Sequence, residues 1–334
     1  MKIGTIDIPE YPLLLAPMED ITDRSFRKLC KMFGADLLYT EFVASEALIR
    51  NIDKSLKKLQ IDDDERPTGI QIYGHSIDAM VEAAKIAEAA RPDLIDINYG
   101  CPVKKIANRG AGAGMLRDIP KMIKMTKAIV DAVKLPVTVK TRLGWDTDSI
   151  VIDKIAKPLQ DTGIKALTIH GRTRSQLYKG MSDWTLIGKI KENSDIHIPI
   201  IGNGDIKDGV SAKNAFDKYR VDAIMTGRAS IGKPWVFKEI KHYLKTGEIL
   251  PEPDITEKVN IAKTHFTLSL KYKEGKRGIF EMRRHFAHYF KGLRNFKELR
   301  LKLLTSTNVD EISDLLDEIK YIYGNKNQEN YVQQ

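Results

Sequence analysis

The chain has 334 residues, 42% of them hydrophobic and 30% charged, with a formal net charge of +9. This length suits a barrel of about 250 residues carrying a further small domain. The sequence has no apolar run of about 18 residues and no basic-then-apolar leader, and its two cysteines, Cys30 and Cys101, form no disulfide framework. We therefore expect a cytoplasmic protein without a membrane-spanning helix, because isolated thiols persist in reducing surroundings.

Eight short apolar runs rich in β-branched residues alternate with helical stretches, which is the order expected of a parallel sheet wound by β–α units. The predicted strands are residues 13–18, 37–42, 68–73, 94–98, 136–141, 166–170, 199–203 and 222–226. The intervening stretches with apolar residues at helical spacing include 77–90, 120–133, 150–160 and 211–219. We therefore predict an α/β protein built on a closed (β/α)8 TIM barrel. An open doubly wound sheet is the alternative.

The pattern changes after the eighth predicted strand. Residues 234–244 predict a last barrel helix, and the Gly- and Pro-containing residues 246–253 predict a linker, so the barrel is expected to span residues 1–248. Residues 249–334 are expected to form a small C-terminal α-helical domain. Its predicted helices are 255–272, 279–293, 296–305 and 309–323, and the polar end at 325–334 is expected to be frayed.

Positive charge is concentrated in this helical domain. Residues 258–302 contain thirteen lysines and arginines and three glutamates, a net charge of +10 that accounts for the excess of the whole chain. Charge gathered in one segment predicts a polyanionic partner, whereas evenly spread charge would not.

Nearly every predicted strand ends in a polar or glycine-containing signature, at the end where barrel enzymes carry their active sites. These signatures are Met18-Glu19-Asp20, Glu41, Gln71, Asn98 with Cys101, Lys140 with Arg142, His170 with Arg172, Asn203-Gly204-Asp205 and Gly227-Arg228. If the barrel closes, all eight converge on a single mouth.

Two neighbouring signatures predict a phosphate site. Asn203-Gly204-Asp205 follows the seventh predicted strand and Gly227-Arg228 follows the eighth, where barrels often bind phosphate through backbone N–H groups. Either alone could be a glycine turn that closes a loop. Together with Arg228, a potential bidentate anion ligand, they favour a phosphorylated cofactor.

Three other side chains suit a flavin ring. Lys140 ends the run Pro-Val-Thr-Val-Lys, so its ammonium group is expected inside the mouth, where a buried cation requires an anion. A reduced flavin provides one, because its negative charge gathers near N1 and O2. Gln71 and His170, at the ends of their own strands, could hydrogen-bond the ring and the phosphate region. Taken singly, Lys140 could be an ordinary strand-end lysine and His170 a structural histidine.

Cys101 is the candidate proton donor. A buried free cysteine is more often a packing residue, but Cys101 lies in a Gly-Cys-Pro turn after the fourth predicted strand, whereas Cys30 lies in an apolar helical run. With an unperturbed pKa of about 8.5, the thiol is mostly protonated near neutrality, which suits a general acid.

The glycine-rich run 110–114, flanked by Lys104, Lys105 and Arg109, could be a lid or a loop that contacts an RNA backbone. It is not a dinucleotide fingerprint, because it lacks the preceding strand and the spaced acid. No Cys/His cluster has zinc spacing and no Walker A run is present, so we expect no metal site.

The sequence resembles the tRNA-dihydrouridine synthases, most closely the bacterial B-type. The matching stretches are Ala16-Pro17-Met18 with Thr22-Asp23, Gln71-Ile72-Tyr73-Gly74, Asn98-Tyr99-Gly100-Cys101-Pro102, Val139-Lys140-Thr141-Arg142, His170-Gly171-Arg172-Thr173-Arg174, Gln176 through Asp183-Trp184, Asn203-Gly204-Asp205 and Gly227-Arg228-Ala229. They span residues 16 to 235 in family order. One departure is Asp20, where the family usually has glycine.

The resemblance implies an FMN-binding barrel, NADPH as electron source and reduction of the C5–C6 bond of a uridine in the tRNA D-loop. It implies FMN contacts from Ala16, Pro17, Met18, Gln71, Lys140, His170, Asn203, Gly204, Asp205, Gly227 and Arg228, and Cys101 as the proton donor to C5. For the tRNA, which the basic helical domain is expected to hold, we predict contacts from Asn98, Lys104, Lys105, Arg142, Arg172, Arg283 and Arg284.

Two other functions compete with this one. A flavin barrel that acts on a small molecule, of the dihydroorotate or enoate type, would share the strand-end signatures but has no need of the basic segment. An RNA-binding barrel without activity would be colourless and would not require Cys101.

Overall fold

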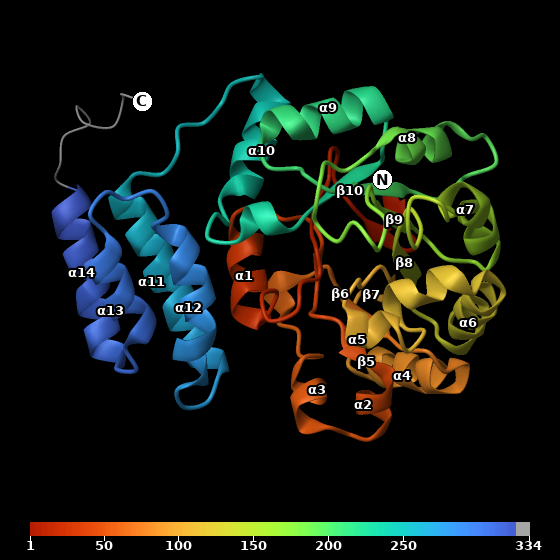
Figure 1. Ribbon diagram of the computed structural model, residues 1–334, viewed down its shortest axis with the longest axis horizontal. Helices are drawn as coiled ribbons and strands as arrows, with labels where there is room; N and C mark the ends of the chain where they lie inside the picture. The colour runs from red at the N-terminus through yellow and green to blue at the C-terminus, as the bar shows by residue number, and fades with distance from the viewer. Residues whose placement is uncertain (325–334) are drawn as a thin grey trace.

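The computed structural model describes residues 1–324 and confirms the predicted barrel (Figure 1). The eight parallel strands are β3 (Leu13–Leu15), β4 (Leu38–Tyr39), β6 (Thr68–Tyr73), β7 (Leu94–Tyr99), β8 (Val137–Arg142), β9 (Leu167–His170), β10 (Ile200–Asn203) and β11 (Ala223–Thr226). They pair in the order β3-β11-β10-β9-β8-β7-β6-β4, and a parallel bridge between Leu14 and Leu37 joins the two ends of the sheet. The predicted frayed end at 325–334 lies outside the described residues.

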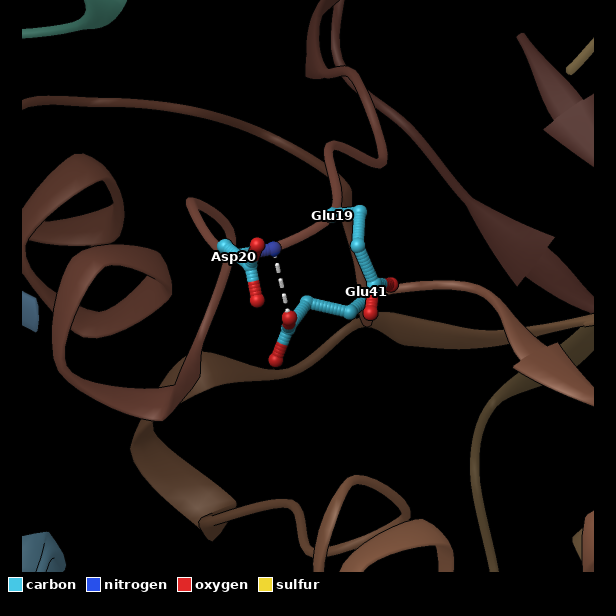
Figure 2. Close-up of side chains that lie close together, drawn as sticks. All are labelled: Glu19, Asp20 and Glu41. Carbon is cyan, nitrogen blue, oxygen red and sulfur yellow. Dashed lines mark hydrogen bonds between the residues drawn. The ribbon is translucent and has the colours of Figure 1, made fainter. Parts of the chain in front are cut away.

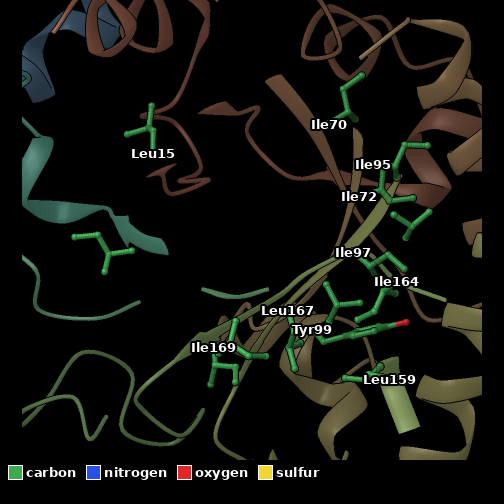
Figure 3. Packing of buried hydrophobic residues seen from close by; sticks show 14 of the residues in the cluster. Leu15, Ile70, Ile72, Ile95, Ile97, Tyr99, Leu159, Ile164, Leu167 and Ile169 are labelled. Atoms are coloured by element: carbon green, nitrogen blue, oxygen red, sulfur yellow. The ribbon is translucent and has the colours of Figure 1, made fainter. Parts of the chain in front are cut away.

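Helices surround the strands on the outside. The longer ones are α1 (Arg24–Met32), α4 (Ile77–Ala89), α6 (Ile119–Ala132), α7 (Ile152–Asp161), α8 (Thr185–Glu192), α9 (Gly209–Tyr219) and α10 (Val236–Thr246). Short elements in the loops are α2 (Ser45–Ile49), α3 (Asp53–Lys57), α5 (Lys104–Ala107) and the 3-10 turns η1 (Asp63–Glu65), η2 (Gly112–Arg117) and η3 (Arg228–Ser230). Outward-facing residues such as Ile70, Ile72, Ile95 and Ile97 form the main core with these helices (Figure 3).

Successive strand residues point alternately out and in, so the positions between those isoleucines face the barrel interior. At the amino-terminal end the interior is filled by a second apolar cluster that includes Leu14, Tyr39 and Leu94. Ile3 and Ile8 join it from a short hairpin of β1 (Lys2–Ile3) and β2 (Ile6–Asp7). That end is closed, so the opposite, carboxyl end remains for a ligand.

The C-terminal helices are α11 (Ile255–Tyr272), α12 (Arg277–Tyr289), α13 (Lys297–Thr305) and α14 (Val309–Gly324). They share a third core, which Trp235 joins from the end of the barrel. Among these helices, α11 contacts α1, and α12 lies beside α1 in Figure 1. Among the helices of residues 1–324, none has the length and apolar character needed to span a membrane.

The contact between barrel and C-terminal helices is mixed apolar and ionic. The Phe26 ring packs on His265 and His285, with centroids 5.5 and 4.7 Å away. Beside it, the Lys273 ammonium binds the Asp23 carboxylate, which also caps α1 through the Phe26 N–H. Because α1 begins just after the loop that follows β3, the C-terminal helices are attached close to the barrel mouth.

A buried ion pair supports this loop and gives a stability prediction. The Arg27 guanidinium donates to both carboxylate oxygens of Glu65 at 2.8 and 3.0 Å, and the two residues are 2% and 0% exposed. Arg27 also donates to the Thr22 carbonyl, and the Thr22 hydroxyl accepts from the Met18 N–H. We expect Glu65→Gln to destabilise the protein by about 3–5 kcal/mol, because it leaves a buried guanidinium without its counter-charge.

Thermal unfolding measures this effect. Asp64→Asn is the matched control, since Asp64 forms its ion pair with Lys28 at the surface, where such pairs contribute little. Equal unfolding midpoints for the two variants would contradict the assignment of the stabilising role to the buried pair.

Candidate active site

A cavity of about 1480 Å³ opens at the carboxyl ends of the strands. Sixteen of the predicted site residues line it: Ala16, Pro17, Met18, Gln71, Asn98, Cys101, Lys104, Lys140, Arg142, His170, Arg172, Asn203, Gly204, Asp205, Gly227 and Arg228. Sites for one small molecule typically measure about 300–1,000 Å³, so this cavity has room for a cofactor and a second ring.

The Cys101 turn is held from two sides. The Asn98 carboxamide oxygen accepts from the backbone N–H groups of Gly100 and Cys101, both at 2.9 Å, and the Cys101 carbonyl accepts from the Ala113 N–H. Gly112 lies against the Cys101 side chain, where an added Cβ would stand 3.0 Å from the cysteine Cβ. The glycine-rich run is thus a buried support for the turn rather than a free lid.

Cys101 is 6% exposed and lines the cavity. Burial raises its pKa, an effect partly offset by a backbone hydrogen bond from Val103 and by the Arg142 guanidinium. The thiol is therefore protonated throughout the neutral range, as a proton donor must be. Cys30 is fully buried on α1 and does not line the cavity.

Lys140 extends from β8 into the same cavity. Its ammonium donates to the Asn203 carboxamide oxygen at 3.1 Å, while the Asn203 amide donates to the Met225 carbonyl at 2.7 Å. Burial, followed by the nearby Arg142 guanidinium, lowers the pKa of Lys140 to about 8. The ammonium group is therefore in surroundings that an anionic ligand would improve.

The two arginines predicted to contact substrate lie deeper than expected, each 2% exposed. Arg142 donates to the carbonyls of Gly100, Thr173 and Leu177 at 2.8 to 3.0 Å. Arg172 donates to the Gly180 carbonyl at 2.6 Å and to the Asp205 carboxylate at 2.7 Å. Both line the cavity, but most of their donors hold the loop that follows β9 against its neighbours.

The predicted phosphate region lies beyond β10 and β11. Arg228 is half-exposed and donates to the Asp205 carboxylate at 3.1 Å, with the Tyr178 ring centroid 4.6 Å from its guanidinium carbon. Burial, together with Arg142, Lys140 and Arg172, lowers the pKa of His170 well below its ordinary value, so the imidazole is neutral here.

Sequence reasoning missed three parts of this site. Tyr178 and Ser182 line the cavity, and Ser182 donates to Asp205 through both its N–H and its hydroxyl. Both lie in the stretch 176–184, which resembles the family but in which neither residue was assigned a role. Asp96 was missed because it lies inside a strand: its carboxylate accepts from Gln71 at 2.6 Å and from Thr138 at 2.5 Å.

Three acidic side chains, Glu19, Asp20 and Glu41, gather at the rim with atoms close enough to share a cation (Figure 2). The Lys58 ammonium occupies this position, 2.5 Å from Glu19 and 3.3 Å from Glu41. The Asp20 N–H also donates to Glu41, with Asp20 at a left-handed φ of 56° that glycine would adopt more easily. The cluster therefore identifies no metal site, and the absence of a metal stays a prediction.

Three predicted RNA contacts lie away from the cavity lining. Lys105 is exposed on α5. Arg283 donates to the carbonyls of Thr305 and Ser306 inside the helical region, and Arg284 donates to the Asp20 carbonyl across the junction with the barrel. Their roles in RNA binding stay predictions.

Taken together, a closed parallel barrel with a cationic, thiol-bearing mouth has the architecture of a cofactor-dependent barrel enzyme. The chain belongs to the dihydrouridine synthase family: the family model described as "Dihydrouridine synthase (Dus)" matches residues 14–322. This membership confirms the resemblance stated from the sequence motifs and makes the protein an oxidoreductase.

Curated relatives match about nine tenths of the chain. A "Probable tRNA-dihydrouridine synthase" of Rickettsia conorii is 42% identical over 301 residues, covering 90% of both chains. The "tRNA-dihydrouridine synthase B" of Pseudomonas aeruginosa is 39% identical with the same coverage, and that of Proteus vulgaris is 41% identical, covering 87% of this chain and 89% of its own.

Solved structures share the fold at low identity. A 2-naphthoyl-CoA reductase complex superposes with a TM-score of 0.58 at 14% identity, covering 72% of this chain and 51% of its own. Morphinone reductase in complex with tetrahydroNAD gives 0.51 at 13% identity, covering 76% and 91%. These likenesses support the barrel and nothing finer.

Proposed function

We propose that this protein reduces a uridine in the D-loop of tRNA to 5,6-dihydrouridine, using FMN as bound cofactor and NADPH as electron donor. One observation carries the proposal. The buried, protonated thiol of Cys101 lies in the same cavity as the Lys140 ammonium group, which is buried and forms no ion pair within residues 1–324. The names of the relatives support tRNA as the substrate.

The donor set of the cavity fits FMN. Seven basic side chains but only two acidic ones line it among the described residues: Lys104, Lys140, Arg142, Arg172, Arg174, Lys207 and Arg228 against Glu19 and Asp205. Arg228 and the backbone at Gly204 and Gly227 would hold the phosphate, and Lys140 with Gln71 would bind the polar edge of the ring. When bound and reduced, FMN supplies a hydride to C6 of the uracil.

Cys101 completes the addition from the other face of the base. Its S–H bond breaks as the proton passes to C5, and solvent reprotonates the thiolate afterwards. Arg142 holds the Gly100 carbonyl next to this cysteine, so its role is to fix the turn as well as to raise the positive potential. The base must leave its stack to reach the cavity, at a cost of roughly a few kcal/mol.

The alkaline pH dependence tests the thiol. A donor works only below its pKa, and burial raises the pKa of Cys101. We therefore expect single-turnover oxidation of the reduced enzyme by tRNA to be flat through neutrality and to fall only above the usual cysteine value of about 8.5. Cys101→Ser should be slow and lack this fall, because a serine hydroxyl does not ionise there. The same fall in the serine variant would assign it to another group, such as Lys140.

We propose further that residues 249–334 are a separate tRNA-binding domain and that the barrel ends near 248. Ten of the basic residues of this domain illustrate two kinds of surroundings. Lys258, Lys263, Lys273, Arg277 and Arg284 form ion pairs, whereas Lys291, Arg294, Lys297, Arg300 and Lys302 are exposed and have no ion pair within residues 1–324. The second group is free to neutralise phosphates, which a small-molecule reductase would not require.

Salt dependence tests this assignment. Replacing Lys291, Arg294 and Lys297 together by alanine should weaken tRNA binding and flatten the plot of log affinity against log salt by about one unit per lost phosphate contact. The matched control replaces three exposed lysines on barrel helices, Lys124, Lys154 and Lys189. A slope that changes equally in both triple variants would place the RNA elsewhere.

A further inference from the structure

A buried carboxylate lies beneath the reactive turn, where the chemistry proposed above does not use it. Asp96 is on β7, two residues before Asn98 and therefore on the same inward face of the barrel. It is 1% exposed, and the sheet register places it between Gln71 on β6 and Thr138 on β8. Each carboxylate oxygen accepts one hydrogen bond, from the Gln71 amide at 2.6 Å and from the Thr138 hydroxyl at 2.5 Å.

From Asp96 the hydrogen bonds continue to the cysteine in one direction. The Gln71 carboxamide oxygen accepts from the Asn98 amide at 2.9 Å, and the Asn98 oxygen accepts from the N–H groups of Gly100 and Cys101. Four residues on two strands and one turn are thus connected without a gap. Gln71, Asn98 and Cys101 all line the cavity, whereas Asp96 does not.

The carboxylate sets the direction of this chain. A carboxamide can turn by 180° and exchange its donor for its acceptor, but an ionised carboxylate only accepts. Asp96 therefore forces the NH2 group of Gln71 toward itself and the oxygen of Gln71 toward Asn98. Asn98 must in turn present its own oxygen to the backbone of the turn. Without Asp96, the buried NH2 group of Gln71 would lose its acceptor. Gln71 could then turn or move, and the Asn98 amide would lose the partner that holds it against the turn.

The negative charge of Asp96 is unfavourable where it lies. Burial raises its pKa to about 6, an effect partly offset by the bonds from Gln71 and Thr138 and by the charge of Lys140. An acid whose folded pKa lies above its unfolded value destabilises the protein where it is ionised, which includes neutral pH. A costly charge retained inside a barrel beside its mouth is typical of a functional role.

We propose that Asp96 is a positioning residue that orients Gln71 and Asn98 and thereby holds the Cys101 thiol in place. Asp96 does not line the cavity and acts through two amides. The inference deepens the proposed function, since it rests on Cys101 as the proton donor, but the position of the thiol can be measured without any catalysis.

The test is the rate at which iodoacetamide alkylates Cys101 in the full-length protein, followed on the Cys101 peptide by mass spectrometry so that Cys30 does not contribute. Asp96→Leu removes the acceptor at similar volume, and the released turn should be alkylated about five-fold faster or more, the change expected for one lost hydrogen bond. The matched control is Thr168→Val on β9, whose buried hydroxyl has no partner within residues 1–324 and belongs to no part of the chain of bonds.

Asp96→Asn removes the negative charge of the side chain but keeps an acceptor for the Gln71 amide, so it separates the effect of the charge from the effect of the hydrogen-bond direction. Its oxygen can accept from Gln71 while its NH2 donates to the Thr138 hydroxyl, so the alkylation rate should stay within about two-fold of wild type. Its thermal stability should be equal or higher, because the buried charge is gone. A role in folding alone would instead lower stability and leave the native alkylation rate of both variants unchanged.

Each result decides the proposal. If Asp96→Leu does not fold, Gln71→Met cuts the chain one link later and must give the same acceleration. A folded Asp96→Leu or Gln71→Met protein that is alkylated at the rate of Thr168→Val overturns the positioning role. If instead alkylation accelerates while Cys101→Ala keeps full turnover, the positioning role stands and the proton-donor role fails, so the two proposals are separable.

Discussion

Cys101→Ala is expected to lower dihydrouridine formation by about 10²–10⁴-fold, the usual contribution of a positioned general acid. FMN binding and NADPH oxidation by the flavin should survive, because Lys140, Gln71 and the phosphate region are untouched. The expectation rests on the buried thiol, whose raised pKa keeps its proton available at neutral pH. Rapid mixing of the reduced enzyme with unmodified tRNA isolates the step that this substitution removes.

The matched control for this variant is Cys30→Ala. Cys30 is fully buried on α1, outside the cavity lining, so its loss should change stability slightly and turnover not at all. Unchanged single-turnover rates in Cys101→Ala would show that another group, or water, protonates C5.

Lys140→Met should slow reduction of the bound flavin by NADPH by about 10²-fold, the size of effect seen when one preorganised charge partner of a developing anion is removed. The ammonium lies in the cavity with only the Asn203 oxygen as a hydrogen-bond acceptor within residues 1–324, so a negatively charged ring is the partner that its surroundings lack. Anaerobic stopped-flow absorbance at the flavin band measures the rate directly.

A measurement of thermal stability shows whether slow flavin reduction in Lys140→Met comes from the lost charge or from partial unfolding. Burial lowers the pKa of Lys140 to about 8 in the folded protein. The charged ammonium group therefore lowers the free energy of unfolding at neutral pH, and this loss disappears as the pH rises from about 8 to 10 and the lysine is deprotonated. Lys140→Met should therefore be at least as stable as wild type at neutral pH. Lys165→Met removes an equal charge at the exposed, opposite end of β9 and should reduce flavin at the wild-type rate. Equal rates of flavin reduction in Lys140→Met and Lys165→Met would contradict an electrostatic role for Lys140.

The strands and helices of the barrel could be predicted from the sequence because the same alternation of apolar runs and helical spacing occurs many times along the chain. Each of the eight predicted strand runs overlaps a barrel strand, and the β6 and α11 boundaries agree to the residue, since β-branched runs and helical spacing are local signals. The β1–β2 hairpin was not predicted, because strands of two residues show no period.

The site was predicted less completely, for a physical reason. Residue types at strand ends identify which side chains enter the cavity, and sixteen of nineteen do. They do not show what those side chains bind: Arg142 reaches the Leu177 carbonyl 35 residues away, and Asp96 finds Gln71 only through the register of two strands. Such partners depend on closure of the barrel, which no local pattern contains.

The proposed function is tested most directly by supplying the purified full-length protein with FMN, NADPH and tRNA transcribed without modifications, and mapping dihydrouridine along the RNA. We expect dihydrouridine at one or more D-loop positions, with one NADPH consumed for each residue reduced. A yellow, NADPH-oxidising protein that leaves every uridine of the tRNA unreduced would contradict the account and favour a small-molecule substrate.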